Sequence, residues 1–283
     1  MMLVDQVAAC LKGRENTADC NTRLRADPGM RTPHGGKVLM VQRARLESRT
    51  FDRFGKTSMA NIGFRIHPFA PAAPADLVQA LSRVATAHLS DNMNRLYSVS
   101  AALRPCHKGG RFAGPALTVK VPPGDNLMVH KAIDIARRGD VIVVDAAGVL
   151  EQAIIGEIMS ALAASRGVAG MIIDGAIRDA DALRLSSFPV YARGVTHRGP
   201  YKNGPGEINA PVCIGGLVVQ PGDLVVGDDD GLIVVAPDVA PEVLERAKVQ
   251  AAEEEALLAQ IRSGATVDRA WVDRTLREKG CVF

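Results

Sequence analysis

Residues 140–183, DVIVVDAAGVLEQAIIGEIMSALAASRGVAGMIIDGAIRDADAL, predict a strand–helix–strand unit that restricts the architecture of the chain more than any other stretch. The run at 141–144 is wholly apolar and β-branched, which is typical of a strand covered on both faces in a parallel sheet. We expect a loop over 145–155, a helix over 156–167, where apolar residues recur at helical spacing, and a second strand at 171–173. Two parallel strands joined by one helix favour an α/β fold.

The flanking sequence extends this alternation in both directions. Strands are predicted at 111–121 and 188–192, and helices at 75–88, 92–95 and 125–138. The segment 193–210 has several glycines and two prolines and shows no periodicity. We expect a loop there that is either functional or an interface.

Beyond residue 210 the pattern changes to short apolar strands separated by turns. Strands are predicted at 212–214, 217–219, 224–226 and 232–235. Antiparallel hairpins after parallel units predict two layers of sheet with helices outside, a β/β/α sandwich. The turn Asp228-Asp229-Asp230 lacks the spacing of a calcium loop, so we expect a solvent-exposed hairpin tip.

The two ends of the chain differ from its centre. Residues 1–58 show no periodicity, and we expect a disordered leader or the result of an upstream start codon, with a basic targeting arm as the alternative. The α/β domain is predicted over 59–237. Residues 238–283 predict C-terminal helices with an incomplete apolar stripe, and Trp271 is expected to be a packing anchor.

Charge and composition exclude several classes of function. The whole chain carries a net charge of +3, but residues 1–58 hold eleven lysines and arginines against six acids, a net +5 that leaves −2 for the remainder. Residues 59–283 therefore lack the excess of positive charge that is typical of nucleic-acid binding. No apolar run in the sequence is long enough to span a membrane. The five cysteines lie far apart without zinc spacing, so we expect reduced thiols in a cytoplasmic protein.

The loops that follow the two central strands carry the candidate site. The carboxyl ends of parallel strands share one edge of a sheet, so these loops should face each other. The helix that begins at Gly156 offers free N–H groups and the positive end of its dipole to an anion. Arg178 offers a guanidinium fork for a carboxylate, Asp179 a hard oxygen ligand for a divalent cation, and Glu157 a second carboxylate. We predict a site for a small anionic substrate that chelates a metal.

Each of these acids also has a purely structural interpretation. Asp179 precedes a helical stretch and could serve only as its cap. Glu157 could be a first-turn acid that complements the helix dipole, or an outer ligand of a metal, or a base that acts through water. Asp145 follows a strand, and a loop cap is favoured over a role beside the site.

Several motifs, taken in order, resemble those of one known family. They are GDVIVVDAAG at 139–148, GEIMSALAASRGVAGMIIDGAIRDADALR at 156–184, FPVYARGVTHRGP at 188–200 and PGDLVVGDDDGLIVV at 221–235. The chain resembles the class II 4-hydroxy-4-methyl-2-oxoglutarate aldolases and their RraA-like relatives over residues 71–236. The resemblance implies the swivelling β/β/α fold of that family.

The resemblance also implies roles for particular residues. The family's pyruvyl-binding loop falls on Gly156, Glu157, Ile158 and Met159, whose backbone amides would hold the substrate. Arg178 would clamp the substrate and act in catalysis together with Glu157, and Asp179 would bind the metal. Family aldolases often carry an acid three residues after that aspartate. Ala182 stands there in this chain, with Asp181 one place early.

The function that the resemblance implies is that of a divalent-metal-dependent lyase. Such an enzyme would use Mg²⁺ or Mn²⁺ to cleave 4-hydroxy-4-methyl-2-oxoglutarate-type 2-oxo acids to pyruvate by a retro-aldol reaction, and would also decarboxylate oxaloacetate. Its expected partners are the small 2-oxo acid substrate and further copies of the chain in a homotrimer or dimer of trimers. The alternative is a non-catalytic RraA-like regulator that controls a ribonuclease through protein contacts.

Overall fold

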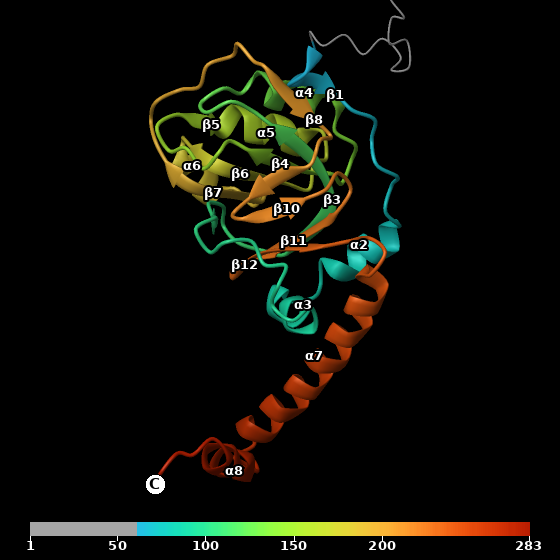
Figure 1. Ribbon diagram of the computed structural model, residues 1–283, viewed down its shortest axis with the longest axis vertical. Helices are drawn as coiled ribbons and strands as arrows, with labels where there is room; N and C mark the ends of the chain where they lie inside the picture. The colour runs from blue at the N-terminus through green and yellow to red at the C-terminus, as the bar shows by residue number, and fades with distance from the viewer. Residues whose placement is uncertain (1–60) are drawn as a thin grey trace, which may run out of the picture. The chain divides into compact units, whose positions relative to one another are not determined.

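Four neighbouring strands form the parallel centre of the main sheet (Figure 1). The computed structural model describes residues 61–283, so the predictions for residues 1–58 lie outside it. The central strands are β3 (Phe112–Lys120), β4 (Val141–Asp145), β6 (Gly170–Ile177) and β7 (Val190–Val195). They pair in the order β3-β4-β6-β7, all parallel. The predicted strand–helix–strand unit is therefore present, with α5 (Glu157–Ser165) following the β4–β5 region and leading into β6.

Three helices cover one face of this sheet. They are α4 (Leu127–Ile135), α5 and α6 (Ala180–Leu185). Alternate side chains of β4 point to opposite faces, and Ile142 and Val144 join Met159 and Leu183 in the core on the helix side. These side chains are almost completely buried, as expected for parallel strands covered on both faces.

A second layer of sheet covers the other face. It contains β9 (Val212–Ile214), β10 (Leu217–Val219), β11 (Leu224–Asp228) and β12 (Gly231–Val235). The core between the layers includes Val141 and Val143 from β4 and Val225 from β11. Strand β3 belongs to both layers, because its first half pairs with β11 and its second half pairs with β4. The predicted α/β class with two sheet layers is confirmed.

Two short strands lie in segments that were predicted to be loops. Strand β5 (Ala153–Ile155) pairs with β6, within the expected loop 145–155. Strand β8 (Gly206–Ile208) lies within the expected loop 193–210, between β1 (Phe64–Ile66) and β3. Strand β2 (Arg104–Pro105) completes the other edge against β7. These strands have two or three residues, too few to show an alternating pattern in the sequence.

Helices pack on the outer face of the second layer. They are α2 (Ala75–Leu81), α3 (Thr86–Asn92) and the start of α7 (Ala240–Arg262). The last helix, α8 (Ala270–Glu278), follows α7 and contributes no residue to this core. Leu81, Leu89 and Leu244 from the three packing helices share a core with the β11–β12 hairpin. The prediction of one helix over 75–88 was wrong, because the chain breaks after Leu81 and restarts at Thr86. The predicted helix at 92–95 is also absent, since Asn94 and Arg95 adopt positive φ angles.

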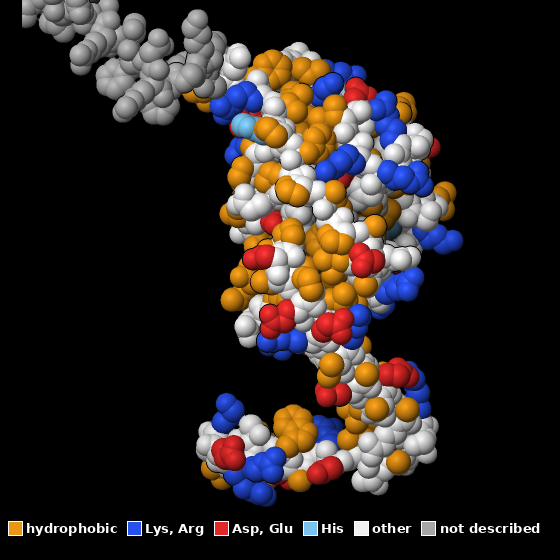
Figure 2. Space-filling view, turned by 90° about the vertical axis from the view of Figure 1, so that its right-hand side faces the viewer, with side chains coloured by type: hydrophobic (Ala, Val, Ile, Leu, Met, Phe, Trp, Pro, Cys, Tyr) orange, Lys and Arg blue, Asp and Glu red, His pale blue; other side chains and the backbone are white. Residues whose placement is uncertain are grey.

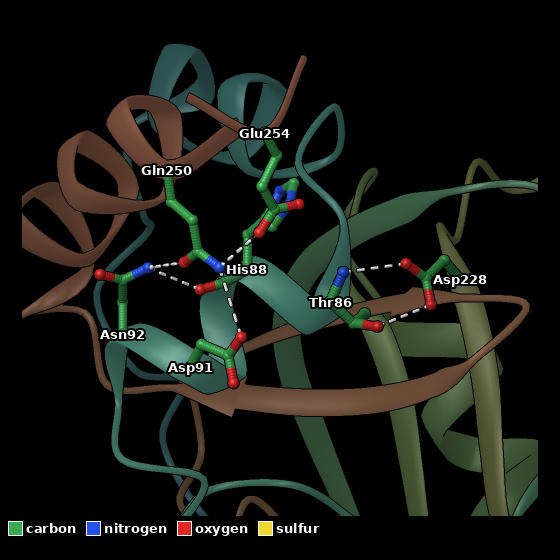
Figure 3. A network of polar contacts seen from close by, with 7 residues as sticks. All are labelled: Thr86, His88, Asp91, Asn92, Asp228, Gln250 and Glu254. Atoms are coloured by element: carbon green, nitrogen blue, oxygen red, sulfur yellow. Dashed lines mark hydrogen bonds and ion pairs between the residues drawn. The ribbon is translucent and has the colours of Figure 1, made fainter. Parts of the chain in front are cut away.

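Asp228 explains the restart of the helix at Thr86 (Figure 3). Its Oδ2 accepts the Thr86 N–H at 2.9 Å, and its Oδ1 accepts the Thr86 hydroxyl at 2.7 Å and the Asp230 N–H at 3.1 Å. The residue is only 7% exposed. The prediction of a solvent-exposed tip is therefore wrong for Asp228, although Asp229 and Asp230 are exposed. The carboxylate instead caps a helix from a distant part of the chain.

A polar cluster joins α3 to α7 (Figure 3). His88 Nε2 lies 2.7 Å from Glu254 Oε2, and this hydrogen bond to His88 is the main reason that the pKa of Glu254 is lowered. Gln250 accepts a hydrogen bond from Asn92 and donates to both Asp91 and Glu254. These contacts hold the middle of α7 against α3.

The C-terminal arm, defined here as residues 255–283, continues beyond these contacts (Figure 1). Figure 2 shows that hydrophobic side chains of this part of the chain lie open on the surface. They include Leu257, Leu258, Ile261 and Trp271. Trp271 is 56% exposed, so within one chain it does not serve as the expected packing anchor. None of the helices in residues 61–283 combines the length and hydropathy needed to cross a membrane.

We predict that Asp228→Ala lowers the free energy of unfolding by about 2 to 3 kcal/mol, because it leaves the buried Thr86 donors without an acceptor. Urea unfolding followed by circular dichroism measures this. The matched control is Asp230→Ala, which removes an exposed carboxylate from the same turn but keeps the Asp230 N–H, and should unfold like the wild type. Equal stability of the two variants would contradict the capping role of Asp228.

Candidate active site

The ends of β5 and β6 bring the two predicted loops together. Their parallel pairing sets Ile155 beside Ile177, and the Arg178 N–H donates to the Ile155 carbonyl at 3.0 Å. The residues that follow each strand are therefore neighbours. Gly156 at the start of α5 meets Arg178 and Asp179 at the end of β6.

The Asp179 carboxylate faces the start of α5. Its Oδ2 accepts the Glu157 N–H at 3.0 Å and lies 3.6 Å from Arg178 Nε. Asp179 precedes α6 with a left-handed backbone (φ 56°) and makes no side-chain hydrogen bond to that helix. The interpretation of Asp179 as only a cap of α6 is therefore wrong. No residue between 61 and 283 donates a hydrogen bond to its Oδ1.

Gly156 permits this close approach. A Cβ atom at this position would lie 2.3 Å from Asp179 Oδ2 and 2.9 Å from Arg178 Cγ. The backbone is extended (φ −150°), so the requirement for glycine comes from this contact and not from the backbone angle. The helix start beside it leaves the N–H groups of Ile158 and Met159 without an acceptor in the helix.

A small hollow opens at this junction. It has a cavity volume of about 30 Å³ and is lined by residues from four segments: Asn126, Ile154, Ile155, Gly156, Ile158, Met159, Arg178, Asp179 and Pro200. Pro200 comes from the predicted loop 193–210, and the backbone at Gly199 passes close to Arg178 Nη1. The loop thus contributes to the lining of the hollow.

Asn126 places an unpaired acceptor at this hollow. Its Nδ2 donates to the Ile154 carbonyl at 2.8 Å and contacts Met159 Sδ at 3.2 Å. Its Oδ1 is buried and has no hydrogen-bond partner in the part of the chain that the structure describes. A buried acceptor without a donor is unfavourable, so this atom suits a donor from a ligand or water in the hollow.

A buried ion pair fixes the strands beneath the site. Asp174 of β6 is 4% exposed and accepts hydrogen bonds from the Arg193 guanidinium of β7 and from the Gly215 N–H at 2.8 Å. The hydrogen bond from Arg193 to Asp174 raises the pKa of the guanidinium, which stays charged. The pair therefore couples β6, β7 and the second layer just before the strands reach the site.

Comparison with known proteins identifies the family of this fold and site. Residues 86–234 match the model of a family described as "RraA-like: Aldolase/RraA". The chain belongs to the RraA-like family.

Individual relatives of this RraA-like protein agree. A protein of Halalkalibacterium halodurans named "Putative 4-hydroxy-4-methyl-2-oxoglutarate aldolase" is 37% identical over 204 residues, which cover 72% of this chain and 97% of that protein. Among solved structures, an uncharacterized protein from Pseudomonas syringae pv. tomato matches with a TM-score of 0.63 and 29% identity, over 70% of this chain and 97% of that chain. RraAS2 of Streptomyces coelicolor is described as an unusual member of the RNase ES inhibitor RraA protein family. It matches with a TM-score of 0.60 and 29% identity, over 66% of this chain and 97% of that chain.

The predicted site residues of the RraA-like protein do not all lie in the hollow. Gly156, Ile158, Met159, Arg178 and Asp179 line it together. The Glu157 side chain is exposed and outside the lining, and only its backbone N–H contacts the site. Two other acids lie apart from the hollow. Asp181 is fully exposed and paired with Arg184 at 3.2 Å, and Asp145 accepts the Ala147 N–H at 3.0 Å, as expected for a loop cap.

Asn126 was missed because its sequence signal is structural. It follows Asp125, whose Oδ1 accepts the Leu127 N–H at 2.9 Å, so the pair looks like an ordinary helix start. Nothing local indicates that its amide reaches Ile154 and Met159, about thirty residues away. A polar residue directly before an apolar helix, at the carboxyl end of a predicted strand, is the only available hint.

We predict that Gly156→Ala lowers any catalytic turnover at this site by about 10²-fold, because the new methyl group displaces Asp179 and Arg178 by close to 1 Å. An assay of pyruvate release from candidate 2-oxo acids tests this, and a thermal melt tests that the fold is retained. Ser165→Ala, at the other end of α5, is the matched control and should keep wild-type turnover. A Gly156→Ala variant with wild-type turnover would show that the close contact is not needed.

Proposed function

We propose that this RraA-like protein is a divalent-metal-dependent lyase that cleaves 4-hydroxy-4-methyl-2-oxoglutarate-type 2-oxo acids to pyruvate and decarboxylates oxaloacetate. The observation that carries the proposal is the shared hollow. A carboxylate, a guanidinium group and the free amides of a helix start open onto it from two adjacent strand ends. The name of the relative from H. halodurans supports the choice of substrate.

Substrate binding follows from the start of α5. The N–H groups of Ile158 and Met159 and the positive end of the helix dipole favour the substrate carboxylate. Arg178 is 44% exposed in its side chain, long enough and free enough to hold a second oxygen of the keto acid. The buried Oδ1 of Asn126 would accept a hydrogen bond from the substrate or from a water beside it.

The donor set fits a hard cation held by Asp179. Its Oδ1 is free of hydrogen bonds from the described residues, and the side chain is 41% exposed. No group of three or more His, Cys, Asp or Glu side chains within residues 61–283 forms a protein cage for a metal. Mg²⁺ commonly binds through one carboxylate together with water and substrate oxygens, which suits this arrangement. When bound, the cation would supply Lewis-acid stabilisation of negative charge on the substrate.

In the retro-aldol step, a base removes the proton of the C4 hydroxyl, C4 becomes a carbonyl, and the electron pair of the C3–C4 bond moves to C3. The resulting enolate of pyruvate is stabilised by Arg178, and protonation of C3 gives pyruvate. Loss of CO₂ from oxaloacetate leaves the same enolate. Glu157 is the proposed base, and because its carboxylate is exposed outside the hollow it would act through a water molecule.

We further propose that the protein assembles as a homotrimer or dimer of trimers. The exposed apolar side chains of the C-terminal arm support association with another copy, because open apolar surface of this kind is typical of interaction sites. Light scattering after size-exclusion chromatography should give three or six chains per particle. A particle of one chain at micromolar concentration would contradict this.

The lyase proposal predicts metal-dependent pyruvate release that requires Asp179 and Arg178. Asp179→Asn keeps an acceptor for the Glu157 N–H but removes the charge that binds the cation, so it should abolish the activation by Mg²⁺ or Mn²⁺. Arg178→Ala should lower kcat by about 10²–10³-fold, the typical effect of losing one preorganised donor. A coupled assay with lactate dehydrogenase and an EDTA control measures both.

Arg246→Ala is the matched control for this experiment. Arg246 lies on the exposed side of α7, paired with Glu242 and outside both linings of the site, so its loss should leave turnover unchanged. Wild-type protein that releases no pyruvate with either metal would contradict the lyase. It would favour the alternative, a protein-binding regulator of a ribonuclease, for which the similarity to the RNase ES inhibitor relative RraAS2 is the supporting observation.

A further inference from the structure

A second and larger hollow adjoins the first at Arg178 and Asp179. It has a cavity volume of about 550 Å³. Besides Arg178 and Asp179, its lining consists of Ala180, Asp181, Ala182, Val195, Thr196 and His197. A molecule that occupies both hollows must pass Arg178 and Asp179, the residues that the proposed function places at the reacting end of the substrate.

The first hollow is too small for a whole substrate of the proposed class. Its cavity volume of about 30 Å³ contrasts with the roughly 300–1,000 Å³ that typical small-molecule sites provide. It takes only one end of such a substrate, and the proposal places the pyruvyl carboxylate there, on the amides at the start of α5. The rest of the substrate would extend past Arg178 and Asp179 toward the second hollow.

The sheet register places two donors at this hollow. Ile177 pairs with Val195, and the Thr196 N–H donates to the Ile177 carbonyl at 2.9 Å, so Thr196 follows β7 directly beside Arg178. The Thr196 Oγ1 accepts one long hydrogen bond, from the Arg198 N–H at 3.5 Å. The Thr196 O–H is therefore free to donate to a ligand. The His197 imidazole makes no hydrogen bond or ion pair with any residue between 61 and 283.

The second hollow offers several hydrogen-bond donors to an acidic group. Asp181 is the one lining carboxylate besides the proposed metal ligand, and it is fully exposed to solvent and paired with Arg184. Solvent therefore screens its charge. Arg178, Thr196 and His197 remain as donors, and Ala180 and Ala182 leave room beside them.

We infer that His197 and Thr196 bind a second carboxylate of the substrate, carried on the carbon beyond the scissile bond, and thereby determine specificity. This rests on the proposed function, whose reacting residues it leaves unchanged. The consequence is that these two residues, and not the groups at the reacting end, discriminate between a ligand with a second carboxylate and one without it.

Two ligands that differ at the far end test the assignment by binding alone. With Mn²⁺ present, pyruvate would engage only the reacting end of the site, whereas 2-oxoglutarate carries a second carboxylate toward the second hollow. His197→Ala should weaken 2-oxoglutarate about tenfold or more, the effect of losing one hydrogen bond to a charged group, and leave pyruvate unchanged. Thr196→Val, which removes the hydroxyl but keeps the side-chain shape, should act in the same direction. Isothermal titration calorimetry measures the affinity of the wild type and of each variant for each of the two ligands.

Two further variants separate recognition from altered folding. His197→Gln retains an N–H donor and should recover most of the affinity for 2-oxoglutarate. His130→Ala, a histidine of α4 outside both hollows, is the matched control and should bind both ligands like the wild type.

Each outcome bears on a different claim. A loss confined to 2-oxoglutarate supports the assignment. Equal weakening of both ligands by His197→Ala, or no weakening at all, overturns the assignment while the lyase proposal stands. Wild-type protein that binds neither ligand with Mn²⁺ overturns both.

Discussion

One hydrogen bond, from the Glu157 N–H to Asp179 Oδ2, joins the two halves of the candidate site. Asp179 makes this bond with a left-handed backbone, which costs a non-glycine residue roughly 1 to 2 kcal/mol. A hydrogen bond to a charged group contributes about 1.5 to 3 kcal/mol, so the bond can offset this strain. This hydrogen bond needs glycine at position 156, since any side chain there would occupy the space of the carboxylate. The left-handed residue is thus part of the geometry of the site.

The layered core explains why that geometry can be held. Strand β4 sends Ile142 and Val144 into the core on the helix side and Val141 and Val143 into the core between the sheets. Neither face of the strand is free to move. The Asp174–Arg193 pair then ties β6 and β7 together a few residues before the site begins. The site residues stand on short extensions of these strands, so their positions depend on the core more than on their own loops.

The sequence predicts those parts of the molecule that depend on local pattern. The β-branched run of β4 and the helical spacing of α5 are such patterns, and the approach of Arg178 and Asp179 to Gly156 follows from the rule that parallel strands share a carboxyl edge. Features that depend on residues far away in the sequence could not be predicted from local pattern. The break before Thr86 is set by Asp228, 142 positions away, and the amide of Asn126 is directed by the Ile154 carbonyl. The direction of the Glu157 side chain, away from the hollow, also has no local signal.

Ala182 stands where the resemblance to the aldolases implies an acid, and this has a physical consequence for the proposed enzyme. Asp181 does not compensate, because its carboxylate is fully exposed and held by Arg184. Asp179 would then be the single carboxylate ligand of the proposed cation, and a cation held through one carboxylate would bind weakly by itself. A 2-oxo acid would add oxygen ligands and a negative charge beside it. Cation and substrate should therefore bind with positive coupling, and each would raise the affinity of the site for the other by the same factor.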